Sequence, residues 1–472
     1  MSKSVKIRLF VYFLLGFIVF AASKTLAISD PVSVPNNSFG IHIANIQDLE
    51  DAAKLVNSEG GDWGYVTLVI TEGNRSVSLW QEVFDKMRRL HIIPIIRVAS
   101  KEENGNWKKP LLGEIDGWVS FFNSLNWVVK NRYITIGNEV NLGKEWGGEV
   151  NPEEYAIYLK EFTAKLKKES ADFFVMPAGF DASLPTSKTS LDESAYLVRM
   201  IRKEKDVFEL VDGWASHSYP NPNFSGSEYA SGKGTIRTFE WERVFLKSIG
   251  VKKDLPVFIT ETGWAHKVSG NKTSSIFLNE SLLSSKFERA FKYTWSDNNV
   301  VAVTPFILNY EYPPFEMFSW KNGGNFNSLY ENMRKVAKTK GVPIQEDKAE
   351  ISRIFVPAIN LLGREFTGLF FVENKGQTIW LKDNLKISDE DGNNLEISRI
   401  SLNSYEPGGS GFIVFKGKSP EKEGDFQKSI ILSNETGKIS KPISFKINSI
   451  ATLRMRLSNF LDSLTSLWHP VR

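Results

Sequence analysis

Residues 133–139 read Tyr-Ile-Thr-Ile-Gly-Asn-Glu, and residues 257–261 read Val-Phe-Ile-Thr-Glu. Each stretch is a short run rich in apolar and β-branched residues that ends in a glutamate. A strand with no polar face must be covered on both sides, which is typical of a parallel sheet. The two stretches therefore predict buried parallel strands that each carry a carboxylate at the carboxyl end.

Runs of this kind recur between residues 39 and 310, separated by longer segments of helical period. They cover residues 39–44, 64–70, 92–98, 133–138, 173–178, 211–217, 256–261 and 300–307. Eight strand–helix units match a (β/α)8 barrel, which takes roughly 250 residues, better than an open doubly wound sheet. No Gly-rich phosphate motif follows the first run, which disfavours a dinucleotide fold. We expect an α/β fold with a TIM barrel over residues 30–345.

The segment 350–449 has a different texture, because its strand-like runs follow one another without helices. These runs cover residues 354–357, 367–372, 378–381, 412–415, 429–432 and 443–447. Turn signals such as Asp391-Gly392 and Gly408-Gly409 lie between them. The pattern predicts a smaller, all-β accessory domain, an antiparallel β-sandwich.

Both ends of the chain carry apolar segments. Residues 1–27 have basic residues, then the apolar run 9–22, then small residues up to Ala27, the layout of a cleaved signal peptide or an N-terminal anchor. Residues 450–472 predict an amphipathic helix, either packed on its own domain or lying on a membrane surface. We expect an extracytoplasmic protein, secreted or membrane-anchored, with membrane-surface attachment through either terminus left open.

The composition removes several classes of function. Lys and Arg number 58 against 55 Asp and Glu, too balanced for the basic field of a nucleic-acid-binding protein. With no Cys and only five His, the chain has no disulfide framework or thiolate zinc site, and few imidazoles for a metal cage. We therefore predict no metal and no cofactor, which leaves carboxylate chemistry and disfavours a metal-dependent barrel hydrolase.

The two glutamates that end their strands are the candidates for that chemistry. Functional groups of a closed parallel barrel lie at the carboxyl ends of its strands. Glu139 follows the fourth run and Glu261 ends the seventh, so the two face each other across the barrel mouth. Two carboxylates that flank a glycosidic bond can act as proton donor and nucleophile.

Other side chains are predicted around this pair. His217 and Tyr219 are two residues apart at the end of the sixth run, so they share a face and can hold an ionised carboxylate. Arg97, at the end of the third run, provides either a buried structural ion pair or charge support for the nucleophile. Tryptophans near strand ends are predicted to stack on sugar rings: Trp146, Trp264 and Trp320.

These motifs resemble a known family. The stretches 136–140, Ile-Gly-Asn-Glu-Val, and 259–264, Ile-Thr-Glu-Thr-Gly-Trp, resemble the acid/base and nucleophile motifs of clan A retaining glycoside hydrolases. The second is similar to the signature of endo-1,3-β-glucanases, although Ala265-His266 stands where that signature usually has Pro. The stretch 217–219, His-Ser-Tyr, is similar to one in family 5 cellulases.

The resemblance implies a role for four of the residues. Glu139 would be the general acid/base, Glu261 the nucleophile, Asn138 a donor to the sugar 2-hydroxyl, and Tyr219 a partner of the nucleophile. The chain is then predicted to be a retaining O-glycoside hydrolase acting on a β-linked polysaccharide or oligosaccharide. A non-catalytic carbohydrate-binding or cell-envelope protein on the same scaffold is the alternative. The sugar, its linkage, endo or exo action and the oligomeric state stay open.

Overall fold

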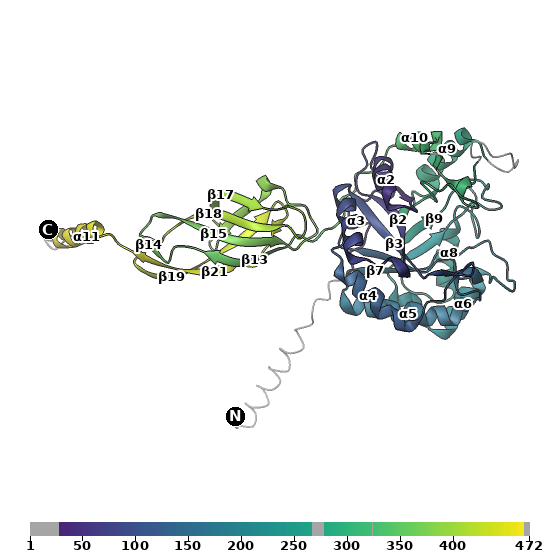
Figure 1. Cartoon of the computed structure of the whole chain (residues 1–472), viewed down its shortest axis with the longest axis horizontal. Coiled ribbons are helices and arrows are strands. Elements are labelled where there is room, and N and C mark those ends of the chain that lie inside the picture. The colour runs from purple at the N-terminus through teal and green to yellow at the C-terminus, as the bar shows by residue number, and fades with distance from the viewer. Residues whose placement is uncertain (1–27, 267–277, 323, 467–472) are drawn as a thin grey trace, which may run out of the picture. The chain divides into compact units, whose positions relative to one another are not determined.

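The computed structural model describes residues 28–266, 278–322 and 324–466 (Figure 1). The predicted leader, residues 1–27, lies outside the described residues. The chain forms two compact units. The first includes the described residues up to Leu125 together with Lys130–Ile344, and the second includes Asn126–Val129 and the described residues from Gln345 onward.

The first unit is built on eight parallel strands. They are β1 (Gly40–His42), β2 (Gly64–Thr71), β3 (Ile92–Ala99), β6 (Arg132–Ile136), β7 (Phe173–Pro177), β8 (Trp214–His217), β9 (Val257–Glu261) and β10 (Val300–Val303). They pair in two arcs, β1-β2-β3-β6-β7 and β10-β9-β8. Single parallel bridges, Phe39 to Val303 and Asp181 to His217, connect the arcs at both seams and close the ring. This ring agrees with the predicted barrel.

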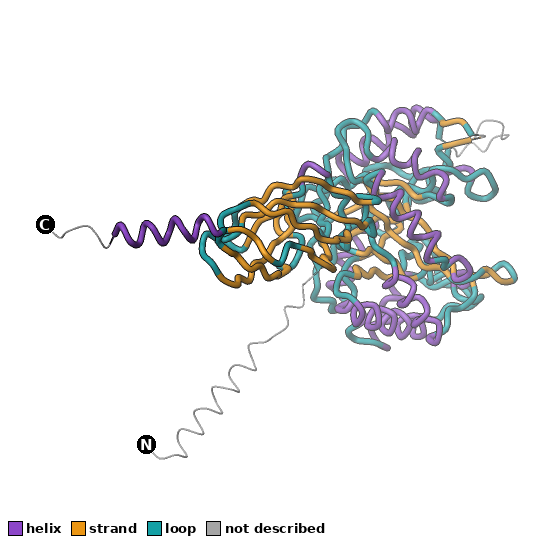
Figure 2. The backbone as a smooth tube through the Cα atoms, turned by 60° about the vertical axis from the view of Figure 1, so that its left-hand side comes forward, coloured by secondary structure: helices purple, strands orange, loops and turns teal. Residues whose placement is uncertain are grey.

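Helices surround the outside of these strands (Figure 2). They are α2 (Leu49–Val56), α3 (Val77–Arg89), α4 (Ile115–Ser124), α5 (Pro152–Glu169), α6 (Glu193–Lys203), α7 (Val207–Leu210), α8 (Thr238–Ser248), α9 (Glu280–Arg289) and α10 (Ser328–Arg334). Helix α5 shows why they begin where they do. The Asn151 side chain accepts a hydrogen bond from the Glu154 backbone N–H at 3.1 Å, and Pro152 occupies the first turn, where no N–H is needed.

The floor of the barrel is aromatic. Tyr65, Tyr133, Phe174 and Phe258 are each the second residue of their strand, and all are buried. Their ring centroids lie 5.0–6.4 Å apart in edge-on and tilted contacts. Such packing fills the amino-terminal half of the barrel, so polar groups gather at the opposite, carboxyl ends of the strands.

Short two-residue strands also form two hairpins in the loops, β4 (Glu102–Glu103) with β5 (Asn106–Trp107) and β11 (Lys321–Asn322) with β12 (Asn325–Phe326).

The second unit is a curled, largely antiparallel sheet. Its strands are β13 (Ala349–Phe355), β14 (Ile359–Leu361), β15 (Glu365–Asn374), β16 (Lys386–Asp389), β17 (Asn394–Leu402), β18 (Ser410–Lys418), β19 (Gly424–Asn434), β20 (Gly437–Lys438) and β21 (Ile443–Ile450). Strand β16 pairs with both β17 and β19, which joins the strands into one sheet. A sandwich of two separate sheets is therefore not confirmed. Strands β14 and β21 pair in parallel.

The predicted strand at residues 378–381 is wrong. Trp380 is buried there, but its backbone N–H bonds to the carbonyl of Tyr405 outside any ladder. The chain instead enters a 3-10 turn at Lys382–Asn384. Trp380 packs into the hydrophobic core of this unit from a segment that is not a strand.

The predicted C-terminal helix is present as α11 (Leu453–Ser466). Leu453, Leu457 and Leu461 are spaced four residues apart, and all three are exposed. Among the described residues, no helix combines the length and the apolar character needed to cross a bilayer. Attachment of this helix to a membrane surface stays a prediction.

Candidate active site

The barrel brings Glu139 and Glu261 to one place. Glu261 is the last residue of β9, and Glu139 lies three residues after the end of β6. The backbone that connects β6 to Glu139 is unusual. Gly137 has φ 91° and Glu139 has φ 34°, both in the left-handed region. A hydrogen bond from the Glu139 N–H to the carbonyl of Gly179, 2.9 Å long, holds this turn. A non-glycine residue kept in this region is a form of strain often found at functional sites.

His217, the last residue of β8, connects the two carboxylates. Its Nδ1 lies 3.0 Å from Oε1 of Glu139 and 3.8 Å from Oε2 of Glu261. One oxygen of each glutamate and one nitrogen of His217 all lie within 4.8 Å of one another. Retaining glycosidases place their two carboxyl groups roughly 5–5.5 Å apart, whereas inverting enzymes need about 6.5 Å or more. The nearest oxygens of Glu139 and Glu261, at most 4.8 Å apart, are close enough for the shorter arrangement.

Three further groups surround Glu261. Tyr219 donates its hydroxyl hydrogen to Oε2 at 3.1 Å, and Arg97 donates from Nη1 to Oε1. His42, at the end of β1, has its Nε2 4.0 Å from the same Oε1. Both oxygens of Glu261 are thus engaged by donors, which favours the ionised form of this carboxylate.

The pKa values of the two glutamates move in opposite directions. For Glu139, burial is the main cause, and it raises the pKa in spite of the hydrogen bond with His217. For Glu261, burial acts upward, but the charges of His217 and Arg97 outweigh it and lower the pKa to about 2. At neutral pH, Glu261 is therefore ionised, while Glu139 is the better proton donor of the two.

The two histidines of the site also differ. Burial would lower the pKa of His217, but the charge of Glu261 and the hydrogen bond to Glu139 outweigh it, so the pKa is raised. Burial and the positive charge of Arg97 lower the pKa of His42 to about 3, which keeps this imidazole neutral. The sequence analysis did not single out His42, which lies inside the first predicted run, 39–44, but is the last residue of β1 in the structure.

Asn138 and Arg97 belong to the same cluster. Arg97 Nη1 donates to Asn138 Oδ1 at 2.8 Å, so the guanidinium contacts both the amide and the Glu261 carboxylate. Glu145 was also missed by the sequence analysis, and no local pattern pointed to it. Its Oε2 accepts a hydrogen bond from Asn138 Nδ2 at 3.3 Å.

All three predicted tryptophans are almost fully buried. Trp264 and Trp320 are each 1% exposed and both pack edge-on against Phe287. The prediction that these two serve as sugar platforms is corrected, because a ring enclosed by core side chains offers no face to a ligand. Trp146 is 2% exposed, and its Nε1 donates to Glu154.

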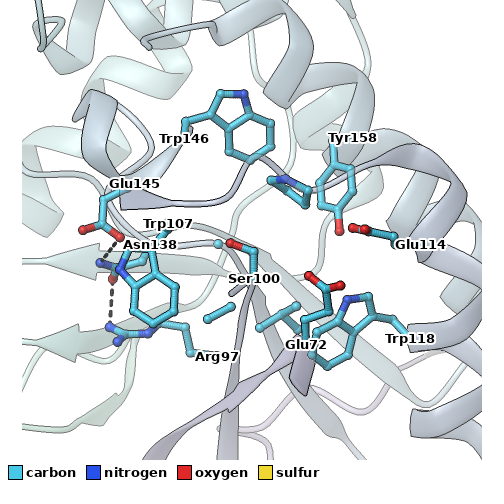
Figure 3. Close-up of a pocket in the computed structure, with 14 residues that line it drawn as sticks. Glu72, Arg97, Ser100, Trp107, Glu114, Trp118, Asn138, Glu145, Trp146 and Tyr158 are labelled. Atoms are coloured by element: carbon cyan, nitrogen blue, oxygen red, sulfur yellow. Dashed lines mark hydrogen bonds between the residues drawn. The ribbon is translucent and has the colours of Figure 1, made fainter. Parts of the chain in front are cut away.

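A small pocket lies beside the reaction centre (Figure 3). Arg97 and Asn138 form part of its wall, and Arg97 also donates a hydrogen bond to Glu261. Aromatic rings and carboxylates make up much of the rest: Trp107, Trp118, Trp146, Tyr158, Glu72, Glu114 and Glu145.

The cluster of Glu139, His217 and Glu261 has the spacing of a metal site, since each offers one ligand atom. These atoms already have protein partners: Glu261 binds Arg97 and Tyr219, and His217 faces Glu139. A metal ion would have to displace the Arg97 cation from Glu261. The donor set therefore suits a charge-compensated acid pair better than a metal cage.

Comparison with known proteins gives distant structural similarities. No family model matches the chain, and no curated protein matches it. A GH128 (subgroup II) endo-β-1,3-glucanase from Sorangium cellulosum is 14% identical, covers 64% of this chain and 98% of its own, and has a TM-score of 0.40. A modular endo-β-1,4-mannanase of family 26 from Cellulomonas fimi is 11% identical, covers 88% of this chain and 94% of its own, and has a TM-score of 0.39.

A β-mannanase from Thermomonospora fusca is 13% identical, covers 64% of this chain and 88% of its own, and has a TM-score of 0.41. These structures are clan A glycoside hydrolases, the group that the motifs of this chain resemble. Similarity at this level assigns no activity to the chain. A function has to be inferred from the residues of the site.

Proposed function

We propose that this protein is a retaining O-glycoside hydrolase that acts on a β-linked polysaccharide or oligosaccharide by double displacement. One observation carries the proposal: two carboxylates with oxygens within 4.8 Å of each other have pKa values shifted in opposite directions. In such a pair, the protonated carboxyl group can donate a proton and the ionised one can act as nucleophile, the two roles that the reaction requires.

In the first step, the ionised Glu261 attacks the anomeric carbon, and Glu139 gives its proton to the departing glycosidic oxygen. This step forms a covalent glycosyl ester on Glu261 and releases the leaving sugar. In the second step, the Glu139 carboxylate removes a proton from water, whose oxygen attacks the anomeric carbon and frees Glu261. Two inversions at one carbon retain its configuration.

The neighbours of Glu261 support this division of work. Arg97 and Tyr219 stabilise the ionised carboxylate before attack and when it leaves again in the second step. His217 lies between the two acids, within hydrogen-bonding distance of Glu139. The neutral His42, whose Nε2 lies 4.0 Å from Oε1 of Glu261, packs edge-on against Phe306 with ring centroids 5.1 Å apart.

The proposal is tested with Glu139→Gln and Glu261→Gln in a screen of β-glucans, β-mannans and aryl β-glycosides. Each variant should lose at least about 100-fold in kcat/KM on unactivated substrates while keeping its melting temperature. Glu139→Gln should retain more activity on an aryl glycoside whose phenolate leaves without protonation, a difference that Glu261→Gln cannot show. The control is Glu149→Gln, which changes an exposed glutamate in the same loop.

A 2-deoxy-2-fluoro glycoside should become covalently attached to Glu261, and peptide mass spectrometry locates the adduct. Hydrolysis at the wild-type rate by either glutamine variant would defeat the proposal. Glycan binding without any turnover across the screen would instead favour the non-catalytic carbohydrate-binding alternative. Action outside the cytoplasm remains part of the proposal and rests on the sequence of residues 1–27 alone.

A further inference from the structure

Glu145 lies beside the reaction centre, although it is not one of the two acids of the proposed mechanism. It ends the short 3-10 helix Gly143–Glu145, seven residues after Asn138. Its side chain is 8% exposed, and Oε2 accepts the hydrogen bond from Asn138 Nδ2 at 3.3 Å (Figure 3). A carboxylate held in so buried a place loses hydration, so its few polar contacts are significant for the site.

The Glu145 contact begins a chain of hydrogen bonds that ends on the nucleophile. Asn138 Oδ1 accepts from Arg97 Nη1 at 2.8 Å, and the same Nη1 donates to Glu261 Oε1. Only one orientation of the Asn138 amide serves both neighbours, with NH2 toward Glu145 and C=O toward Arg97. The opposite orientation would set two donors against each other at Arg97 and two acceptors at Glu145.

We propose that Glu145 is a positioning residue that locks the amide of Asn138 and, through it, the guanidinium of Arg97 against Glu261. The inference rests on the proposed glycosidase function, since it assigns Glu145 a task in that same reaction. Glu145 does not contact Glu261, so it acts only through the two intervening side chains. The second amide hydrogen of Asn138 stays available to a ligand in the orientation that Glu145 selects.

The charge of Glu145 makes the orientation of the Asn138 amide dependent on pH. Burial raises the pKa of Glu145 to about 7, and the charge of Glu139 adds to this effect against Arg97 and the hydrogen bond from Asn138. Lys144 Nζ lies 3.9 Å from its Oε1. An ionised Glu145 can only accept, which fixes the amide, whereas a protonated Glu145 can also donate and tolerates either orientation.

Two further acids face Glu145 across the pocket. Glu72 and Glu114 line the same pocket, and Lys108 pairs with both, at 3.6 and 2.9 Å. Lys108 compensates these carboxylates locally. Glu145 is then the pocket acid whose ionisation is coupled to the reaction centre, through Asn138 and through the charge of Glu139.

The experiment compares the full chain with Glu145→Ala, Glu145→Gln and the control Glu149→Gln, which changes an exposed glutamate of the same loop outside the pocket lining. Glu145→Ala should lower kcat about 10- to 100-fold with a much smaller change in KM, because a small displacement of reacting groups has effects of that size. It should also slow covalent labelling of Glu261 by a fluorinated glycoside. Glu145→Gln keeps an acceptor, so kcat should recover in part.

The pH profile separates positioning from a merely structural role. The wild-type rate should contain a rising limb near pH 7 as Glu145 ionises, and Glu145→Gln should lack this limb while Glu149→Gln keeps it. Melting temperatures identify any variant that has lost its fold, and Glu145→Gln then decides the question, since it replaces a carboxylate with a group of nearly the same shape.

The proposal is overturned if a folded Glu145→Ala or Glu145→Gln has the wild-type kcat and pH profile. This result differs from a failure of the proposed function. If Glu261→Gln is inactive but the Glu145 variants behave as wild type, only the positioning role is lost. If Glu261→Gln itself hydrolyses glycosides at the wild-type rate, the proposed function fails first.

Discussion

Gly179 is the position where a single methyl group should disable the site. Residue 179 follows β7, and its backbone carbonyl holds the Glu139 N–H. A Cβ added at Gly179 would lie 2.1 Å from Cδ2 and 2.4 Å from Nε2 of His217, whereas ordinary contacts begin at 3.4 Å. The buried imidazole and the Gly179 backbone would have to separate by roughly 1 Å or more, a displacement that can reduce the rate about 100-fold.

The Gly179→Ala change should therefore lower kcat by about two orders of magnitude, with a loss of about 1–3 kcal/mol in the free energy of unfolding from overpacking. The assay is kcat/KM on an aryl β-glycoside together with urea unfolding. The matched control is Gly113→Ala, because a Cβ there meets no atom within 4 Å. A folded Gly179→Ala variant with the activity of the control would refute the placement of His217 against Gly179.

Two other perturbations test the electrostatics. Replacing Arg97 with Gln removes a positive charge that keeps the pKa of Glu261 low, so the acidic limb of kcat/KM should move to higher pH; an unmoved limb would contradict the ion pair. Glu193 and Glu242 are both 0% exposed, and burial and then the charge of Glu242 raise the pKa of Glu193. Because the folded state binds the proton more tightly, stability falls as pH rises above the ordinary carboxyl pKa. The Glu193→Gln variant should melt at a higher temperature than wild type at pH 8 and show little difference at pH 4, and equal melting at pH 8 would count against a buried acid pair.

Much of the barrel could be predicted from local patterns. Runs such as 133–136 have no polar face and must be covered on both sides, and Asn151-Pro152 begins a helix by capping chemistry that involves only near neighbours. The second unit was harder to predict. Strand β17 alternates exposed and half-buried residues, so its apolar signal is weak, whereas the buried Trp380 suggested a strand that does not exist.

Within the site, the sequence pointed to residues whose position along a strand was informative. Glu261, His217 and Arg97 all lie at or near strand ends, and the barrel brings those ends together. The same reasoning was wrong for Trp264 and Trp320. Nearness to a strand end does not distinguish a ring that faces the barrel mouth from one packed between strands and helices. Trp264 and Trp320 are rings of the packed kind, since both contact Phe287.

The amino-acid sequence by itself determined the periodic strand–helix units, the absence of thiol chemistry and the two glutamates that end their strands, since each depends on residue type and short-range spacing. Tertiary structure alone decided which groups touch: His42 beside Glu261, Gly179 against the His217 ring, and Glu145 on the amide of Asn138. These contacts join residues that are distant in the chain or separated by an irregular loop. Their distances follow from how the ring of strands closes, and so do the opposite pKa shifts of Glu139 and Glu261, because burial and neighbouring charge are properties of the assembled barrel.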